Sequence, residues 1–589
     1  MLNQLVDYAK TKLSGSEPGF TARNVRWLIE LSLDGQLVNV LPLGDDKRTE
    51  QTSKCPEMHN MNAGGRAHFL VETLQTVALY IKPNEDPKKV AGAKEKQLFF
   101  SDMVRQAALK VVVLQPLAKF MEDAEKLEML RERLAKEKAK PTEWLCWSIA
   151  GSDPLQQVEV LDWWRKWRVA DQANGRLELK PRGKTNALRG DAKQADMICF
   201  LTGVQIQPLL TQPKITGLSG VGGLGTGDVM VGFDKDAFKS FGLEQASNAA
   251  MSEKAAREYV DALNHLVKNS SRKLANALVV HWFKEAVRPE DDLVDFFYEP
   301  PELTEGAARQ SAREILESLR TGLRPVPANN RFYAMTVSGA SGRVMVRDWM
   351  EGSFEELIIR VGQWFSDLEI VTRNGGKLAP DPKFMAVCGA LVRELKDLPA
   401  QTTPTLWRVA LAGIPIPQSF IALALARFRT DLIDDKPFNH ARMGLMKAYF
   451  IRKGGNHSMS AYLNKEHPEP AYQCGRLLAL LASLQRAALG DVGAGVVQRY
   501  YVSASQTPGL TIGRLVSNAK NHLNKLDGGL AFWYEDQIAE IMGRIQNRIP
   551  ATLDLEKQSL FALGYYQQIA VNRTGSKNNS ANQSKEGDD

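Results

Sequence analysis

The spacing of apolar residues divides this chain into a mixed first part and a helical last part. From about residue 380 onward, apolar residues recur every three or four positions, a spacing typical of amphipathic helices. We expect helices over these stretches: 382–397, 404–411, 417–429, 440–452, 471–489, 510–526, 533–547 and 555–570. This succession of helices predicts a bundle with at least four members.

The first part combines helical patterns with strand patterns. Residues 24–43 place two apolar-rich runs around Asp34-Gly35, a strong turn pair for a hairpin. Residues 2–13 and 96–136 favour helices, and Ser252 is a credible N-cap for a helix that follows it. The predicted fold class is therefore α+β, with a mixed α/β N-terminal region containing β-hairpins and an all-α C-terminal helix bundle.

The length of 589 residues exceeds what one core supports, so several domains are expected. We divide the chain into these segments: an N-terminal α+β domain (1–379), a helical connecting region (380–458), a C-terminal helical bundle (459–571) and a disordered tail (572–589). The tail is predicted to be disordered because it is polar and poor in apolar residues.

A second hairpin is predicted between Arg331 and Trp349. Phe332 to Val337 and Arg343 to Arg347 have strand character, and five small residues, Ser-Gly-Ala-Ser-Gly, connect them. Alternation places Arg343, Met345 and Arg347 on one face. Small residues flanked by arginines allow a close approach to a phosphate chain, although an ordinary surface hairpin has the same pattern.

Two further stretches carry residues suited to nucleic acid. The polar segment 45–68 ends in Asn60, Asn62, Gly64-Gly65 and Arg66, a set that can read base edges, although a mobile surface loop is equally compatible. The segment 161–189 interleaves three tryptophans with basic residues, which suits a backbone and stacked bases. Equally, these tryptophans can belong to the core while only the arginines face water.

Two glycine motifs resemble phosphate-binding signatures without meeting their requirements. The run Gly220–Gly225 satisfies G-x-G-x-x-G, but strand-like residues follow it where a dinucleotide fold needs a helix. We therefore expect these glycines to form a flexible connection between strands. Gly183-Lys184-Thr185 lacks the earlier glycine of a phosphate loop, because Glu178 stands there.

Composition limits the class of protein. The chain is 44% hydrophobic and 24% charged, with a net charge of +7, as in a mildly basic globular protein. Its five cysteines lie far apart, which predicts buried thiols in a reducing cytosol and no zinc ribbon. The N-terminus is unlike a signal peptide and no apolar run reaches membrane length, so we expect a cytoplasmic protein without membrane partners.

Catalytic signatures are missing from the sequence. None of the eight histidines stands in metal-hydrolase spacing, and no G-x-S-x-G is complete. We therefore expect a binding protein that is not an enzyme, with no catalytic residues, no metal and no cofactor. The alternative is a metal-dependent nuclease or helicase with a spatially assembled site, and a scaffold that never touches DNA is a third possibility.

Four blocks together resemble the large subunit of type I-C CRISPR Cascade, an RNA-guided DNA surveillance complex. The blocks begin at Cys199-Phe200-Leu201-Thr202-Gly203, at the 331–349 hairpin, at Ala471-Tyr472-Gln473-Cys474-Gly475-Arg476, and at Arg499-Tyr500-Tyr501 together with Phe561-Ala562-Leu563-Gly564-Tyr565-Tyr566. They follow the order of that family along the chain. Their conjunction makes the resemblance specific, since any single block is weak.

The resemblance implies a non-catalytic role in antiviral defence. Such subunits recognise the protospacer-adjacent motif in duplex DNA, promote unwinding and R-loop formation, guide the displaced strand and recruit the helicase-nuclease. The implied partners are CRISPR RNA, double-stranded target DNA, the handle-capping and backbone subunits of Cascade, and small subunits. In this family the C-terminal bundle is also made separately by internal translation, which we expect to start at Met459, with Met443 and Met446 as competing starts.

Site residues follow from this role, because base pairing reads the sequence and the protein reads only a short motif and the backbone. The predicted motif-binding residues are Asn60, Asn62, Arg66, Ser338, Ser341 and Arg343. The predicted backbone-binding residues are Arg165, Lys166, Arg168, Arg182, Lys184 and Arg347. The predicted displaced-strand residues are Arg476, Arg486, Arg499 and Arg514.

Overall fold

The structure is a computed structural model of the whole chain. It describes all residues except 14–16, 45–49, 59–64, 178–195, 234, 239, 240, 242, 244, 299–311, 316, 318–329, 400, 434–438, 455–458, 491, 493, 494, 547 and 584–589. The chain forms two compact units. Unit 1 contains residues 1–213 and 231–262, and unit 2 contains residues 214–230 and 263–589.

Unit 1 is built on a four-stranded sheet in the order β3-β2-β6-β5. Its strands are β2 (Trp27–Leu31), β3 (Leu37–Pro42), β5 (Glu72–Thr73) and β6 (Trp144–Ile149). β2 and β3 form the hairpin predicted around Asp34-Gly35, and Gly35 has the positive φ of 76° that its turn requires. β6 runs parallel to β2 and completes a sheet whose apolar face is buried.

Unit 1 also contains helices and two smaller pairs of strands. The helices are α1 (Leu2–Lys12), α2 (Leu74–Val77), α3 (Pro87–Ala108), α4 (Gln115–Glu122), α5 (Ala124–Lys136), α6 (Val158–Leu177) and the first part of α7 (Glu253–Asn269). The pairs are β1 (Phe20–Val25) with β4 (Glu50–Pro56), and β7 (Met197–Ile198) with β8 (Gln205–Ile206). Ser252 caps α7 as predicted, since its hydroxyl accepts the N–H of Ala255.

Unit 2 begins with an antiparallel sheet in the order β12-β11-β10-β9. Its strands are β9 (Ser271–Leu274), β10 (Ala277–Phe283), β11 (Arg331–Ala340) and β12 (Arg343–Ser353). The helix α10 (Phe354–Leu368) starts at once after β12, because Ser353 and Glu356 form a capping box. The buried face of α10 joins the sheet to the helices that follow.

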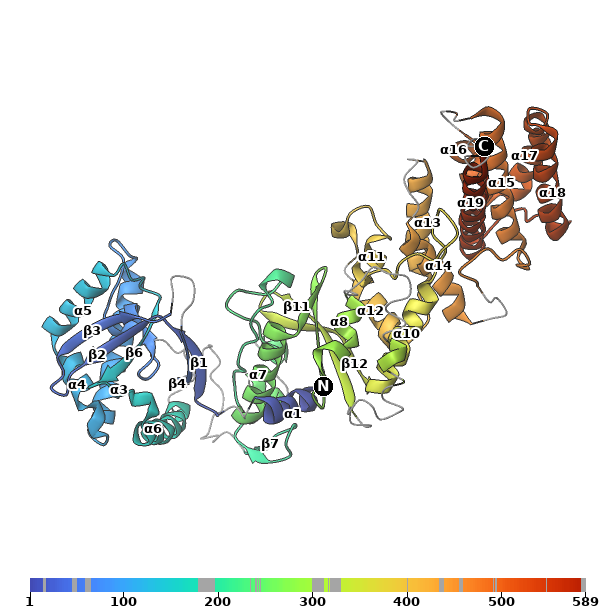
Figure 1. The fold of residues 1–589 in the computed structure, drawn as a ribbon. Coiled ribbons are helices and arrows are strands. Elements are labelled where there is room, and N and C mark those ends of the chain that lie inside the picture. The colour runs from blue at the N-terminus through green and yellow to red at the C-terminus, as the bar shows by residue number, and fades with distance from the viewer. Residues whose placement is uncertain are drawn as a thin grey trace. The chain divides into compact units, whose positions relative to one another are not determined.

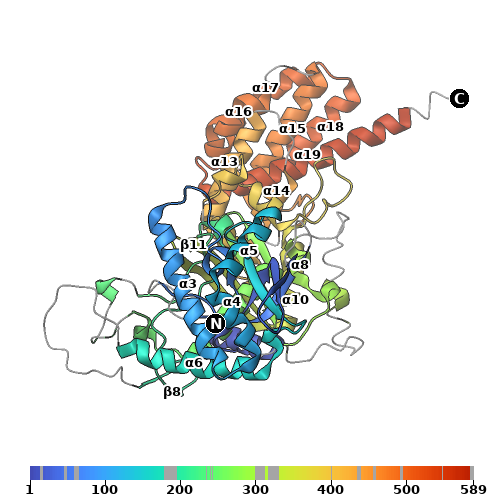
Figure 2. The same ribbon diagram turned by 90° about the vertical axis from the view of Figure 1, so that its left-hand side faces the viewer.

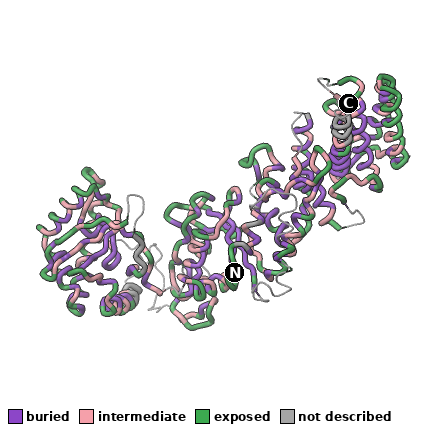
Figure 3. Tube along the Cα trace, in the orientation of Figure 1, coloured by how far each residue is buried: buried purple, intermediate pink, exposed green. Residues whose placement is uncertain are grey.

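The rest of unit 2 is helical, as the apolar spacing predicts. Its helices are α8 (Leu293–Tyr298), α11 (Phe384–Gly389), α12 (Thr402–Ala412), α13 (Gln418–Ile433), α14 (His440–Lys453), α15 (Pro470–Leu489), α16 (Val496–Gln506), α17 (Pro508–Leu523), α18 (Gly528–Ile545) and α19 (Leu555–Gln583). α15 and α19 lie side by side (Figures 1 and 2). Buried residues recur along these helices and the sheet (Figure 3), and they belong to one hydrophobic cluster.

Two glycines explain how closely α15 and α19 approach each other. A Cβ on Gly475 would come within 2.8 Å of the carbonyl carbon of Phe561, and one on Gly564 within 3.0 Å of that of Tyr472. Each helix therefore presents a glycine to the backbone of the other. Both glycines belong to the sequence blocks that carry the family resemblance.

The predicted fold class, α+β, is confirmed. The two compact units do not coincide with the predicted boundaries at 379 and 458, because one core runs from Leu274 to Ala570.

Helix α16 was not predicted. α19 continues to Gln583, through residues predicted to be disordered, and Asn572 donates a hydrogen bond to Ser483 at 2.8 Å. None of the helices within the described ranges has the length and apolarity needed to cross a membrane.

Candidate nucleic-acid interface

The hairpin predicted at 331–349 is present in unit 2, with longer strands than the sequence indicates. β11 and β12 pair from Arg331 with Ser353 to Ala340 with Arg343, so only Ser341 and Gly342 form the turn. Their φ angles, 49° and 90°, are both positive, as in the two-residue turns that match the twist of hairpin strands. Ser338, Gly339 and Ala340, predicted as part of the connection, therefore belong to β11.

A bulge in this hairpin directs one of its arginines. The register shifts between Thr336 and Val337, which leaves Arg347 as the extra residue in β12. Its Nε donates a hydrogen bond to the Ser338 hydroxyl at 2.9 Å. Ser338 is buried and engaged by Arg347, whereas Ser341 and Arg343 are exposed at the tip. The structure thus places these predicted residues together but gives Ser338 an internal partner.

The glycine-rich run 220–225 lies in a closed loop, residues 214–230, which we call the glycine loop. Ile215 and Asp228 close it by exchanging two backbone hydrogen bonds of 2.8 Å. The Asp228 carboxylate is fully buried and both of its oxygens lie 3.2 Å from the Leu224 N–H. The loop is therefore built around an internal carboxylate and is not the flexible connection that we predicted.

The glycine loop packs directly on the hairpin tip. A Cβ on Gly339 would overlap the backbone of Gly223, and one on Gly222 would stand 2.7 Å from the Gly339 oxygen. Val229 then joins the edge of β12, since its N–H donates to Gly342 at 2.9 Å and its oxygen accepts the Val344 N–H at 3.0 Å. These contacts join the two glycine-rich segments into one surface, which we call the composite tip.

A lysine that the sequence analysis missed stands beside this surface. The Lys273 ammonium, on β9, lies 3.9 Å from the place where a Cβ of Gly220 would be. Lys273 and Gly220 are both exposed, as are Leu224 and Met345, at 47% and 39% of their surface. The composite tip therefore offers open backbone, two cations (Lys273 and Arg343) and a few apolar side chains. Nothing in the sequence spacing connects Lys273 with either glycine-rich segment.

Comparison with protein families identifies the class of this chain. The family described as CRISPR-associated protein (Cas_Csd1) matches residues 5–571. The chain belongs to this family. The match spans nearly the whole chain and agrees with the predicted resemblance to the large subunit of type I-C Cascade. No curated protein matches the chain.

The other predicted motif readers of this Csd1-family chain lie in unit 1. Asn60 and Asn62 fall outside the described residues, so their role stays a prediction. Arg66 is described, and its guanidinium contacts both carboxylate oxygens of Asp171, at 2.7 and 3.4 Å, and lies over the Phe99 ring. Arg66 therefore has to release Asp171 before its guanidinium can bind a base or a phosphate.

The tryptophan-rich segment is mostly part of the core, which was the alternative interpretation. Trp163 and Trp164, on α6, are 8% and 0% exposed. Both pack against Phe69, the Trp164 ring stacked on it and the Trp163 ring tilted. Arg165 is paired with Glu17 and Asp162, and Arg168 is buried against Glu253. Lys166 is exposed, and Arg182 and Lys184 lie outside the described residues. Pairing and burial therefore argue against Arg165 and Arg168 as backbone contacts.

The four predicted displaced-strand arginines separate into two groups. Arg486, Arg499 and Arg514 are exposed on α15, α16 and α17. Arg476 is fully buried, and it donates hydrogen bonds to Gln568 at 3.0 Å and to Gln473 at 2.7 Å. The prediction for Arg476 is corrected, because a guanidinium enclosed by the bundle has no surface to offer a strand. Its physical role is to satisfy buried polar groups between α15 and α19.

One cluster of possible metal ligands escaped the sequence analysis. His281 on β10 and the residues Asp292 and Asp295 bring their ligand atoms within 4.8 Å of one another. His281 Nε2 lies 2.7 Å from Asp292, and Arg272 pairs with Asp295 at 2.7 Å. Asp292 also accepts the backbone N–H groups of Val294 and Asp295. These contacts make the cluster part of the polar structure at the start of α8, while His281 Nδ1 and Asp295 Oδ1 are buried without a hydrogen-bond partner.

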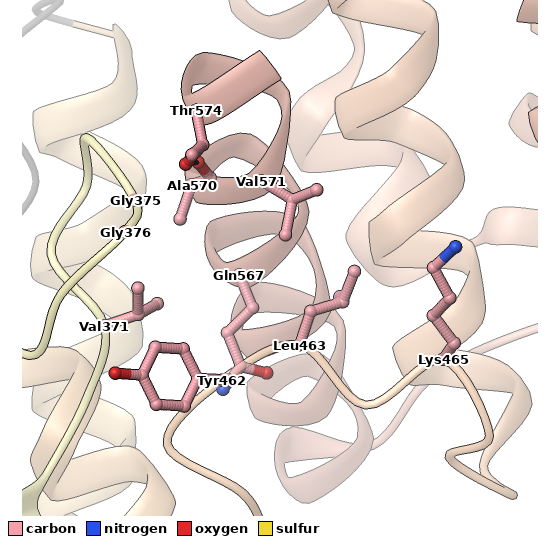
Figure 4. Close-up of a pocket in the computed structure, with 10 residues that line it drawn as sticks. All are labelled: Val371, Gly375, Gly376, Tyr462, Leu463, Lys465, Gln567, Ala570, Val571 and Thr574. Carbon is pink, nitrogen blue, oxygen red and sulfur yellow. Dashed lines mark hydrogen bonds between the residues drawn. The ribbon is translucent and has the colours of Figure 1, made fainter. Parts of the chain in front are cut away.

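A pocket of about 280 Å³ lies elsewhere in unit 2, between the 371–376 turn and α19 (Figure 4). Its wall is largely apolar, with Val371, Tyr462 and Val571 among its residues. The amide of Gln567, which also lines it, already donates to the carbonyl oxygens of Ser460 and Ala461. A ligand site usually has several polar groups directed inward. This pocket has few, so the composite tip is the stronger functional candidate.

Proposed function

We propose that this chain reads a short protospacer-adjacent motif in duplex DNA through the composite tip, as a non-catalytic subunit of an RNA-guided CRISPR complex. The observation that carries the proposal is the packing of the glycine loop on the hairpin turn, with Lys273 and Arg343 beside it. Membership of the Csd1 family supplies the CRISPR context.

The physical argument begins with shape. A two-stranded ribbon that ends in Ser341-Gly342 is narrow, and a β-ribbon is one of the elements that fit a groove of DNA. Backbone and small side chains at the tip permit a close approach to base edges. Lys273 and Arg343 supply positive charge for the phosphates on either side, which fixes the register of the protein on the duplex.

The glycine loop makes this tip rigid. Its buried Asp228 holds the Leu224 N–H, and Val229 is hydrogen-bonded to the edge of β12, so the loop supports the turn from one side. A rigid tip loses little conformational entropy when it binds. Rigidity also suits the opening of a duplex, in which apolar side chains such as Leu224 and Met345 can separate a base step.

The experiment uses the assembled complex with its guide RNA and a library of target duplexes with a randomised flanking motif. Arg343→Ala is expected to weaken binding at least tenfold and to relax discrimination among motifs, since one base contact is worth about 1–3 kcal/mol. Lys273→Ala is expected to weaken binding to all duplexes by the same factor. It should also reduce the salt dependence of the affinity by about one phosphate contact.

Arg331→Ala is the matched control, because Arg331 lies on the same hairpin at the opposite end and pairs with Glu351. It is expected to leave both the affinity and the motif preference as they are. If the Arg343 and Lys273 variants select the same motif with the same affinity as the native chain, the composite tip is not the reader.

We extend the proposal to the displaced strand and the recruited helicase-nuclease. The exposed residues Arg486, Arg499 and Arg514 are the candidates for phosphate contacts on the bundle. The double variant Arg499→Ala/Arg514→Ala is expected to increase chemical footprinting of the displaced strand. Arg544→Ala is the control, since Arg544 lies on α18 and is paired with Glu466. Equal footprints in both variants would reject this assignment.

A separately translated bundle remains part of the proposal. A product starting at Met459 would keep α15 to α19 but would lose α13, whose Phe428 ring packs against Tyr501 at 5.6 Å. Such a product would therefore need another partner on that face. Lys453-Gly454-Gly455 can be encoded by a purine-rich run that permits a ribosome-binding sequence three codons before Met459. Silent recoding of codons 453–455 is therefore expected to abolish a short C-terminal product, and its persistence would point to Met443 or Met446 as the start.

A further inference from the structure

The block Cys199-Phe200-Leu201-Thr202-Gly203 carries part of the family resemblance, yet the DNA-reading proposal does not use it. It forms the turn of a small ribbon in unit 1, with β7 before it and β8 after it. Three large apolar side chains of this ribbon face solvent: Ile198 is 69% exposed, Phe200 52% and Val204 59%. These three side chains stand within seven consecutive residues, at the turn of the ribbon and on the strand ends beside it. Exposed apolar side chains gathered at one protruding element are typical of a contact site.

Backbone hydrogen bonds hold the ribbon to the segment that precedes α7. The Phe200 N–H donates to Ala250 at 3.1 Å, and the Leu209 N–H donates to Met251 at 3.0 Å. Cys199 is buried beneath the turn. Burial acts to raise the pKa of its thiol, but hydrogen bonds from Thr202 and from the Ser252 backbone outweigh burial and lower that pKa. These contacts present the apolar side chains on a fixed support, which reduces the entropy lost on docking.

The surrounding sequence indicates what kind of partner fits. No charged residue occurs between Met197 and Pro213, in a chain that is 24% charged. A nucleic acid would require lysine or arginine at its contact surface, and this segment has neither. The centres of protein–protein interfaces, in contrast, are depleted of charge and enriched in aromatic side chains.

We propose that the β7–β8 ribbon docks into an apolar, uncharged pocket of another protein subunit of the CRISPR complex. Phe200 is the central anchor, with Ile198 and Val204 beside it. The partner pocket is uncharged because an unpaired charge buried against this ribbon would find no opposite charge on it. This inference rests on family membership and is independent of motif reading by the composite tip.

The experiment measures assembly without target DNA. The probe is the guide-RNA complex formed from the other subunits, immobilised and titrated with the full-length chain. Phe200→Ser/Val204→Ser is expected to weaken binding at least tenfold, since a few apolar anchors carry most of the binding energy of an interface. Phe200→Leu, which keeps an apolar anchor, is expected to restore most of the affinity when Val204 is native.

Leu109→Ser/Val112→Ser is the matched control, because these two side chains in unit 1 are also highly exposed, at 82% and 71%. It is expected to bind the probe like the native chain. Both double variants should unfold at the native temperature, since they alter exposed side chains. Unchanged affinity of the Phe200/Val204 variant would overturn the proposal.

Two other results would assign the ribbon to a different partner and would also overturn the proposal. One is concentration-dependent self-association of the native chain in sedimentation that the Phe200/Val204 variant has lost, which would identify a second copy as the occupant. The other is a loss of duplex binding by a variant that still assembles fully. Failure of motif reading in Arg343 variants would leave this test unaffected, because no DNA is present.

Discussion

The carbonyl oxygen of Gly339 lies 2.7 Å from the place where a Cβ of Gly222 would stand. These residues are far apart in the sequence, and each belongs to a glycine-rich stretch that is weak evidence by itself. Their contact leaves no room for any side chain, so both stretches owe their glycines to one packing requirement. The glycine loop and the hairpin therefore form one structural element.

Gly339→Ala is expected to push the glycine loop away from the hairpin. The added Cβ would overlap the Gly223 backbone, which has no flexible end to move aside, and overpacking of this kind costs about 1–3 kcal/mol. Gly225→Ala is the control, because a Cβ there meets nothing within 4 Å. Urea unfolding should show a lower midpoint for Gly339→Ala only. A native midpoint for Gly339→Ala would show that the loop moves freely on the hairpin.

The hairpin was predictable because its signals are local. Alternating apolar residues and a Ser-Gly turn identify β11 and β12 in the sequence, and similar local signals identify the Asp34-Gly35 hairpin, Ser252 as a cap and most helices. The partner of the hairpin was not predictable. The pairing of Gly222 with Gly339 is a long-range contact, and local periodicity carries no information about it.

Gly475→Ala tests the approach of α15 and α19. The new Cβ would come within 2.8 Å of the Phe561 carbonyl carbon, so the helices would have to separate at a cost of about 1–3 kcal/mol. Gly543→Ala in α18 is the matched control, since a Cβ there meets nothing within 4 Å. It should stabilise the chain by about 0.5–1 kcal/mol, because alanine favours a helix interior. Thermal unfolding of both variants shows whether their effects are opposite in sign.

The candidate arginines show which part of a site sequence reasoning misses. Composition correctly identifies segments rich in arginine, but not whether each guanidinium has an acid or amide beside it. Arg66 meets Asp171, and Arg168 meets Glu253 across a long stretch of sequence. Arg476 has the helical spacing of a surface arginine and is nevertheless enclosed. Lys273, in contrast, has no motif around it and stands beside the composite tip.

Arg476→Ala and Arg514→Ala are expected to differ sharply in stability. Removing the Arg476 guanidinium leaves the buried amide oxygens of Gln473 and Gln568 without a donor, which should destabilise the chain by about 1–3 kcal/mol. The cavity left by the side chain adds to this loss. Arg514 is exposed, so its loss should change stability by less than about 0.5 kcal/mol. Chemical denaturation measures both. Similar small effects would mean that Arg476 lies nearer the surface than its burial indicates.

His68 makes the stability of unit 1 depend on pH. Burial, and then the Arg23 guanidinium 3.2 Å from Nε2, lower the pKa of His68 to about 3. An unfolded histidine titrates near 6.5, so between these values the unfolded chain binds an extra proton. The stabilising contribution is therefore complete above about pH 6.5 and decreases on acidification, by up to about 1.4 kcal/mol per pH unit.

His68→Gln is expected to remove this part of the pH dependence. The variant should be less stable than the native chain at pH 7.5, because His68 Nδ1 accepts the Met58 N–H at 3.1 Å in a packed site. The difference between the two chains should shrink towards pH 5, since only the native chain loses the histidine contribution. Urea midpoints at several pH values measure it. A constant difference would show that His68 takes up its proton at the same pH in the folded and the unfolded chain.

The cluster of His281, Asp292 and Asp295 decides between the proposed binding role and the alternative of a metal-dependent nuclease. Its groups are close enough to hold a cation, but each has a partner: Asp292 bonds His281 and the backbone, and Asp295 pairs with Arg272. A bound cation would have to displace these partners and would stand next to the Arg272 guanidinium. We therefore expect the purified chain, incubated with Mg²⁺ or Mn²⁺, to leave duplex and single-stranded DNA intact.

Asp292→Asn separates the two interpretations. If the cluster is structural, this variant loses the carboxylate that contacts His281 and unfolds more readily, by about 1–3 kcal/mol, while neither chain cleaves DNA. If the cluster is catalytic, the native chain cleaves DNA with added metal and Asp292→Asn does not. That second result, with the variant still folded, would replace the binding role by the nuclease alternative, because bond cleavage would then belong to this chain itself.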